Sequence, residues 1–71
     1  MQHELRLLDV VALLRDIPER GLVRGQVGTV VEALAGAYEV EFSDDDGKTY
    51  AELAVEPDQL LVLHHHPQRA A

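Results

Sequence analysis

The stretch GLVRGQVGTVVEAL, residues 21–34, decides the fold that the rest of the chain is expected to adopt. It contains three glycines, the last of which is followed at once by the β-branched run Thr29-Val30-Val31. Glycine reaches positive φ angles without steric cost, so it is used where a chain turns tightly or bulges. Valine and threonine suit a pleated, half-buried surface. The stretch therefore predicts a basic turn that leads into a kinked β-strand.

The phase of this strand has two interpretations. Simple alternation places Val27 and Val30 on opposite faces. A bulge at Gly28 instead lets Val27 and Val30 both face the core, while Thr29 and Glu32 face water. We expect the bulge, because a small closed barrel needs sharp bends and glycine supplies them.

The clearest strand pattern in the chain is the alternation of Tyr38, Val40 and Phe42 with two glutamates. A period of two is typical of a half-buried antiparallel strand. The acidic turn at 43–47 ends in Asp-Gly, which is a hairpin signal, so a fourth strand is expected at 49–55. In that strand the predicted inward side chains are Ala51, Leu53 and Val55, and the predicted outward ones are Tyr50 and Glu52.

The N-terminal part of the chain contains a short apolar run at 10–14. We interpret this run as a strand, because Pro18 follows almost at once and the residue before a proline avoids the helical region. The sequence of residues 1–8 indicates either a short helix or a strand that leads into the first apolar run. Residues 17–22 predict a turn-rich loop with Leu22 tucked beneath it.

The chain is expected to finish with one helical turn and a last strand. Pro57 suits the first position of a helical turn, and the apolar run 60–63 follows it. Together these elements predict an all-β fold, a small five-stranded SH3-like barrel with a short 3-10 turn before the last strand. We expect a single domain over residues 1–63 and a flexible polar tail over 64–71.

Composition excludes several classes of function. The chain has 71 residues and no cysteine, so disulfides, thiolate zinc sites and thiol nucleophiles are excluded. Six Lys and Arg residues against 13 Asp and Glu residues give a net charge of −7. Because phosphate binding requires locally concentrated cations, we expect neither nucleic acid nor a membrane surface as a partner. No apolar run approaches the roughly 18 residues that span a bilayer, and we expect a cytoplasmic protein.

Two clusters contain residue types that bind metals. The acidic turn Asp44-Asp45-Asp46-Gly47 lacks the spaced ligands and the terminal glutamate of an EF-hand loop, so we interpret it as an exposed hairpin tip. The histidines of His64-His65-His66 point to alternate sides of an extended chain, which prevents all three from converging within one monomer. We therefore expect no metal site and no cofactor.

Catalysis is not expected either. The hydroxyl groups available as nucleophiles belong to Thr29, Ser43 and Thr49. A nucleophile needs a base within hydrogen-bond reach, and Ser43 is not near any histidine in the predicted order of elements. A domain of this size also has little room for a pocket of several hundred Å3. We expect no catalytic residue and no small-molecule substrate.

A family resemblance is carried by the order D-I-P-E, G-L and G-x-x-G-T-V-V between Asp16 and Val31, followed by Tyr-Glu-Val-Glu-Phe at 38–42. This order resembles a family of small bacterial proteins catalogued as domain of unknown function 4926. The resemblance covers about Leu8 to Leu63, and it implies a small, single, SH3-like domain without implying an activity. It also implies an antitoxin-like or accessory role as one expectation, because some members are encoded beside toxin-like neighbours.

More distantly, G-x-x-G-x-V followed by Y-x-V-x-F is similar to the SH3-like part of the nitrile hydratase β subunit and to ribosomal KOW modules. These similarities imply two alternatives, an accessory domain of a nitrile-hydratase-like metalloenzyme and a KOW-like RNA-binding module. KOW modules are usually basic, whereas this chain is acidic. The nitrile hydratase relatives hold no metal themselves, so no catalytic residue is implied.

The remaining feature is an excess of apolar residues in the first and last strands. Residues 10–14 and 60–63 are apolar on both faces, and such strands are neighbours in small barrels. On the first strand, one face can lie in the core and the other needs a different cover. The uncovered face consists either of Val11 and Leu13 or of Val10, Ala12 and Leu14. That cover is either the N-terminal segment with leucines 5, 7 and 8 or a protein partner.

We therefore expect a non-enzymatic protein–protein interaction module. Its expected interface residues are Val11, Leu13, Leu61 and Leu63. Its expected partner is a second copy, as a homodimer, or a protein encoded by a neighbouring gene. In the second case the acidic surface would steer a basic protein into contact.

Overall fold

Five antiparallel strands form one sheet in the computed structural model, which describes residues 5–64. The sheet has the strand order β4-β3-β2-β1-β5. The all-β prediction is confirmed, and a short 3-10 turn directly precedes the last strand, as expected. The elements in chain order are β1 (Val10–Leu13), the 3-10 turn η1 (Pro18–Arg20), β2 (Val27–Leu34), β3 (Ala37–Ser43), β4 (Thr49–Val55), the 3-10 turn η2 (Pro57–Gln59) and β5 (Leu60–Leu63).

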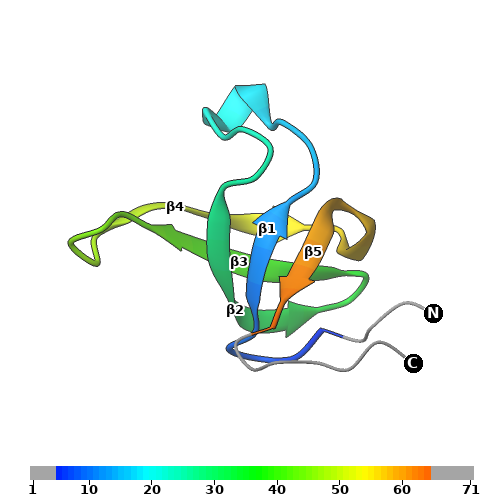
Figure 1. Ribbon diagram of the computed structural model, residues 1–71. Helices are drawn as coiled ribbons and strands as arrows, with labels where there is room; N and C mark the ends of the chain where they lie inside the picture. The colour runs from blue at the N-terminus through cyan, green and yellow to red at the C-terminus, as the bar shows by residue number, and fades with distance from the viewer. Residues whose placement is uncertain (1–4, 65–71) are drawn as a thin grey trace.

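The sheet is strongly bent, and β2 connects its two parts. Figure 1 shows β1 and β5 upright in front of β3 and β4, which run across behind them. Residues 27–29 of β2 pair with β1, and β2 pairs with β3 from Thr29 onward. The apolar core lies where these two parts of the sheet face each other. Closure of the sheet into an SH3-like barrel stays a prediction.

The bulge in β2 lies at Val31 and not at Gly28, so this prediction is wrong. Val30 pairs with Val40, and the next pair is Glu32 with Glu39, which leaves Val31 as the extra residue. Strict alternation from Val30 would direct Glu32 into the core. The extra residue resets the phase and places this charged side chain outside, which avoids the large penalty of burying an unpaired carboxylate.

The position of Gly28 has a different physical reason, the close approach of two strands. Gly28 is buried and pairs with Val11, so simple alternation holds there. An added Cβ would lie 2.7 Å from Cγ1 of Val40, 2.9 Å from the carbonyl oxygen of Glu41 and 3.0 Å from Cδ2 of Phe42. Val27 is consequently outside, with 46% of its surface exposed, and is not the core residue that we expected.

The hairpin of β3 and β4 follows the predicted pattern. Val40 and Phe42 are completely buried, and on β4 the side chains of Ala51, Leu53 and Val55 face inward. The turn closes because Oδ1 of Asp44 accepts the backbone N–H groups of Asp46 and Lys48, each at 2.9 Å. Gly47 supplies the positive φ of +82° that this turn needs.

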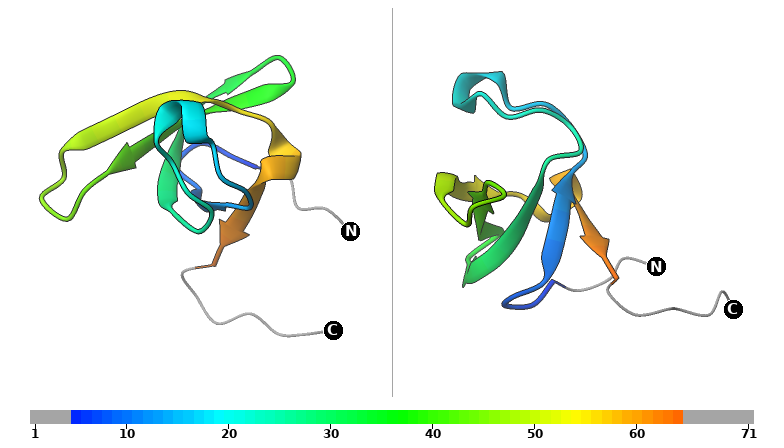
Figure 2. Two further views of the ribbon diagram at one scale, coloured as in Figure 1. Left: turned by 90° about the horizontal axis from the view of Figure 1, so that it is seen from above. Right: turned by 60° about the vertical axis from the view of Figure 1, so that its left-hand side comes forward.

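The long β1–β2 connection is pinned to the core by Leu22, which is 1% exposed, as predicted. Ile17 and Leu22 exchange backbone hydrogen bonds of 2.8 and 3.1 Å. Asp16 accepts the N–H of Arg24 at 2.8 Å. Figure 2 shows this connection projecting beyond the ends of β1 and β2.

The core is a single apolar cluster without buried polar side chains among the described residues. Its buried members are Leu5, Val11, Leu13, Leu22, Val30, Val40, Phe42, Val55 and Leu60. The segment before β1 is neither a helix nor a strand over residues 5–8, in contrast to both alternatives from the sequence. The predicted tail at 65–71 and the first four residues lie outside the described part of the chain.

Candidate interaction surface

Strand pairing places two uncharged rows of side chains on the outside of β2, β1 and β5. In one row Val27 lies opposite Ala12, which lies opposite Leu61. In the other row Thr29, Val10 and Leu63 are neighbours in the same order. We call this surface the outer apolar face, and it consists of Val10, Ala12, Val27, Thr29, Leu61 and Leu63. Val27 and Leu61 are its most exposed members, at 46% and 51%.

The four predicted interface residues divide between the two sides of the sheet. Val11 and Leu13 are 0% and 1% exposed and lie in the core, so they cannot contact a partner unless the fold opens. Leu61 and Leu63 lie on the outer apolar face. Among the two alternatives for the first strand, the residues that alternate with Val11 and Leu13 therefore face outward. The sequence does not show this phase, because it depends on the pairing of Val11 with the buried Gly28.

The N-terminal leucines do not form the predicted cover. Leu5 is 8% exposed and completes one end of the core. Leu7 and Leu8 are 59% and 74% exposed. The backbone turns between Arg6 and Asp9, where the Asp9 carboxylate accepts the N–H of Arg6 at 2.9 Å. Within residues 5–64 this segment leaves Leu61 of the outer apolar face half exposed.

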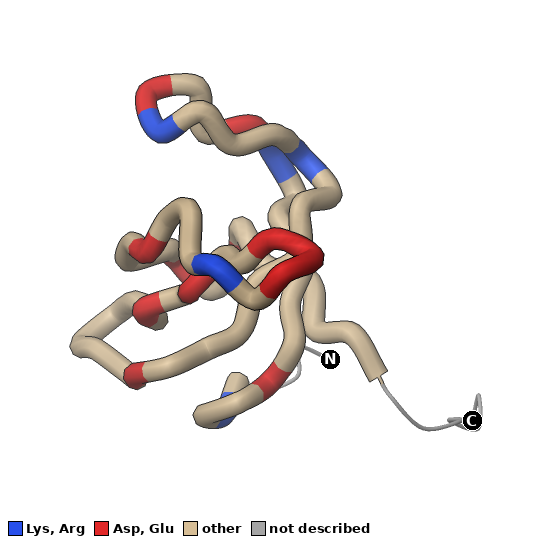
Figure 3. Tube along the Cα trace, turned by 90° about the vertical axis from the view of Figure 1, so that its left-hand side faces the viewer, with Lys and Arg blue, Asp and Glu red and all other residues tan. Residues whose placement is uncertain are grey.

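The same outer surface becomes acidic where it continues onto β3 and β4. The row of Leu63, Val10 and Thr29 continues to Glu41 and then to Glu52. Four glutamates, which we call the acidic ladder, lie on this part: Glu32, Glu39, Glu41 and Glu52. In Figure 3 the red acidic positions lie on the strands behind and beside the β3–β4 turn, whereas the tube of β1 and β5 is tan.

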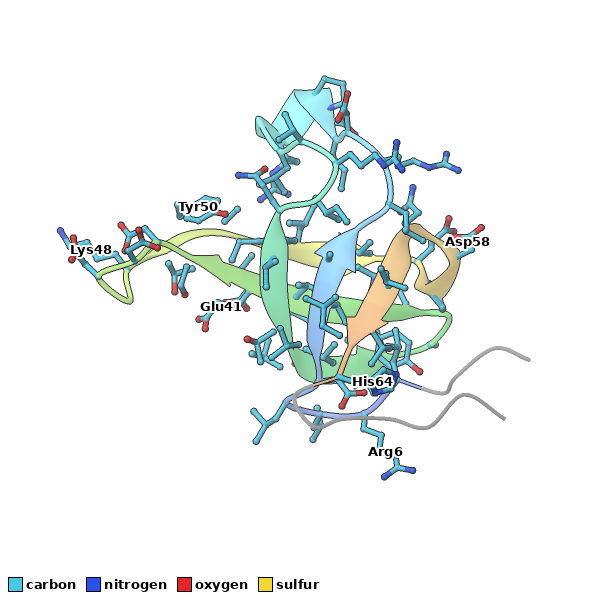
Figure 4. The ribbon with its side chains drawn as sticks, viewed as in Figure 1. Arg6, Glu41, Lys48, Tyr50, Asp58 and His64 are labelled. Atoms are coloured by element: carbon cyan, nitrogen blue, oxygen red, sulfur yellow. The ribbon has the colours of Figure 1, made fainter. Side chains whose placement is uncertain are left out.

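Like charges lie directly opposite each other in the acidic ladder. Glu41 pairs with Glu52, and Glu32 pairs with Glu39, an arrangement that destabilises a sheet. Hydrogen bonding to Glu39 is the largest cause that raises the pKa of Glu52, followed by partial desolvation and by repulsion from the other three carboxylates. The repulsion on the Glu41 carboxylate is partly offset, because the Thr49 hydroxyl donates a hydrogen bond to it at 3.0 Å. Figure 4 shows Glu41 beside the β3–β4 hairpin, away from β5.

We expect the contribution of Glu52 to the free energy of unfolding to increase when the pH is lowered from 7 toward 4.5. The folded state takes up the Glu52 proton more readily than the unfolded chain, so this contribution grows as the pH falls through the raised pKa of Glu52. This contribution to stability is complete below about pH 4.5, which is the ordinary pKa of a glutamate and therefore that of Glu52 in the unfolded chain. Glu52→Gln should therefore raise Tm slightly at pH 7 and reduce the gain on acidification. Thermal melts at several pH values measure this. Glu56→Gln is the control, and an equal effect of both variants would contradict the role of the ladder.

A shallow depression of about 400 Å3 lies between the β1–β2 connection and β4. Its wall contains Asp16, Glu19 and Arg20, and one guanidinium N–H of Arg20 donates to the Glu52 carbonyl oxygen at 3.3 Å. The remaining lining residues are Ile17, Leu53, Ala54 and Gln59. This lining contains no aromatic side chain, which a groove for proline-rich peptides requires.

Two of the residues singled out for metal binding or catalysis, Asp44 and Thr49, have structural partners. The Asp44 carboxylate closes its own turn, and the Thr49 hydroxyl is bound to Glu41. Within residues 5–64, no group of three His, Asp or Glu side chains is placed to hold a metal ion. His64 is exposed, and His65 and His66 lie outside the described residues. None of the helical turns in residues 5–64 is long and apolar enough to cross a membrane.

Comparisons with known proteins place the chain in a family. Neither the curated proteins nor the solved structures contain a match to it. One family model, described as a domain of unknown function (DUF4926), matches residues 7–62, which include β1 to β4 and all of β5 except its last residue. The match confirms the resemblance seen in the sequence. The chain belongs to the DUF4926 family.

Proposed function

We propose that the protein is a non-enzymatic protein–protein interaction module that binds a second copy of itself through the outer apolar face. One observation carries this proposal: uncharged side chains form two continuous rows across three adjacent strands, with Leu61 about half exposed. Large exposed apolar patches usually mark interfaces. The cytoplasm is the compartment that we propose for a chain without cysteine.

The distribution of charge supports a contact between two copies. Neither β1 nor β5 contains a charged residue, whereas the acidic ladder lies on the far part of the sheet. Two copies that meet through the outer apolar face therefore keep their acidic ladders apart. The remaining repulsion between two chains of −7 is long-ranged, so added salt should tighten the dimer.

The size of the surface indicates a weak dimer. Of the residues of the outer apolar face, only Val27 and Leu61 are about half exposed, so the face is small beside the roughly 800 Å2 that each partner typically buries in a stable complex. Loss of translational and rotational freedom opposes association. We therefore expect a dissociation constant in the micromolar range.

Leu61→Glu should weaken this dimer by at least about tenfold, because it places a carboxylate on the most exposed residue of an apolar contact. Sedimentation equilibrium over a wide concentration range measures the change. Val23→Glu is the matched control, since Val23 is 55% exposed on the β1–β2 connection and the variant has the same net charge.

Two results would contradict the proposal. One is a wild-type protein that stays monomeric at high concentration and high salt. The other is an equal loss of association in Leu61→Glu and Val23→Glu, which would indicate a general effect of charge. In either case a different protein partner for the outer apolar face becomes the better interpretation.

A further inference from the structure

Within residues 5–64, strand β5 forms an edge of the sheet that no other strand pairs with. It pairs with β1 on one side and is the last strand of the order β4-β3-β2-β1-β5. Its sequence, LLVL, has no charge and no proline, and its pairing with β1 has no register shift. Natural edge strands usually carry lysine, proline or a bulge, because these features prevent pairing with another chain.

The opposite edge, β4, has those protections. Its register shifts near the β3–β4 turn, where Phe42 pairs with Ala51 and Ser43 pairs with Thr49, so that Tyr50 is extra. It also carries Glu52 in its middle, and Lys48 directly precedes it. Within the described residues, the bulge and the charged side chain that β4 carries are therefore absent from β5.

The register shows which backbone groups β5 presents at its edge. The N–H of Leu14 donates to the carbonyl oxygen of Gln59 at 2.9 Å. By the alternation of antiparallel ladders, Leu61 and Leu63 then bond to β1, while Leu60 and Val62 turn their backbone groups away from it. The N–H of Leu60 is used within η2, where it donates to Pro57. The groups directed outward are the carbonyl oxygen of Leu60 and both groups of Val62.

We propose that two copies associate by antiparallel pairing of their β5 strands, which joins two five-stranded sheets into one of ten strands. This inference rests on the proposed association of two copies and names its geometry: the two outer apolar faces lie side by side, and Leu61 and Leu63 are the members of that face on the strand that contacts the partner. A two-fold axis passes between the two Leu61 residues, and each Val62 N–H donates to the carbonyl oxygen of the partner's Leu60. An isologous contact of this kind closes after two copies.

Side chains and charges agree with this register. It places Leu61, the most exposed side chain of β5, against the partner's Leu61. Figure 4 shows Asp58 and His64 near opposite ends of β5, so antiparallel pairing brings Asp58 to the end that carries the partner's His64. The two β4 strands, which carry Glu52, are the outermost strands in the order of the joined sheet.

The absence of cysteine allows a direct test by single-cysteine cross-linking. Residues opposite each other in a non-hydrogen-bonded antiparallel pair have Cα atoms about 4.5 Å apart, within the range that a disulfide bridges. Leu61→Cys should therefore form a covalent dimer as the main species under mild oxidation. Tyr50→Cys, on the β4 edge and 48% exposed, is the matched control and should stay largely monomeric.

A third variant separates edge pairing from stacking of the two outer apolar faces. Val27→Cys lies on the same face, but β1 separates it from the β5 edge. If it cross-links and Leu61→Cys does not, while sedimentation shows a dimer, the edge geometry is overturned and the proposed function stands. A monomeric wild type overturns both.

Amide exchange of wild-type Val62 tests the same geometry without a substitution. The Val62 N–H should exchange more slowly at high protein concentration, where the dimer forms. An unchanged exchange rate in the dimer overturns the inference.

Discussion

Phe42→Ala is expected to lower the free energy of unfolding by about 3–5 kcal/mol. Phe42 is the largest fully buried side chain and lies near the end of β3. Its removal leaves a cavity between the two crossing parts of the sheet, and a domain of this size has few other large side chains to fill it. Because native proteins are stable by only about 5–15 kcal/mol, the variant should be close to unfolding. Urea denaturation followed by circular dichroism measures the loss.

Tyr50→Ala is the control for this prediction. The two rings are neighbours, with centroids 6.3 Å apart, but Tyr50 is 48% exposed. Its truncation removes a second aromatic ring without opening the core, so we expect a clearly smaller loss. Equal losses in the two variants would show that burial of Phe42 is not what stabilises the sheet.

Gly28→Ala is the second substitution with a large expected effect, although it adds only one methyl group. Alanine usually stabilises relative to glycine by about 0.4–1 kcal/mol, because it restricts the unfolded chain. Here the new Cβ would lie 2.9 Å from the carbonyl oxygen of Glu41, a backbone atom that cannot rotate away. Overpacking of this kind costs about 1–3 kcal/mol, so we expect a net loss of stability. A urea titration of both proteins decides the sign.

The source of the clash can be tested with a double-mutant cycle. The nearest atom to the new Cβ is Cγ1 of Val40, at 2.7 Å, and Val40→Ala removes it. If that contact contributes, Gly28→Ala should cost less in the Val40→Ala background than in the wild type. If the Gly28→Ala variant is as stable as the wild type, β2 and β3 can move apart to accept the methyl group. This result would contradict the close approach of the two strands at Gly28.

Local chemistry made several elements predictable. The alternation at Tyr38, Val40 and Phe42 depends only on the period of a strand, and the structure has β3 there with the expected inward side chains. The Asp-Gly turn and the turn that begins at Pro57 depend on backbone preferences of single residues. These elements need no information from distant parts of the chain.

The phase of β2 was not predictable in this way. Glycine in a strand is compatible both with a bulge and with a close contact, and the pattern of residues 27–32 does not distinguish them. Pairing with β1 on one side and β3 on the other selected the close contact for Gly28 and moved the bulge to Val31. The energetic reason is that Glu32 must face outward while Val30 stays in the core.

The candidate surface has the same division between sequence and tertiary structure. The sequence by itself determined that the first and last strands carry more apolar residues than one core can bury, and that the chain is acidic and lacks cysteine. Only the tertiary structure decided that Val11 and Leu13 face the core while Val10, Ala12 and Leu61 face outward. Both faces of an apolar strand are equivalent in sequence, and they become different only when the cross-strand neighbour of each residue is known.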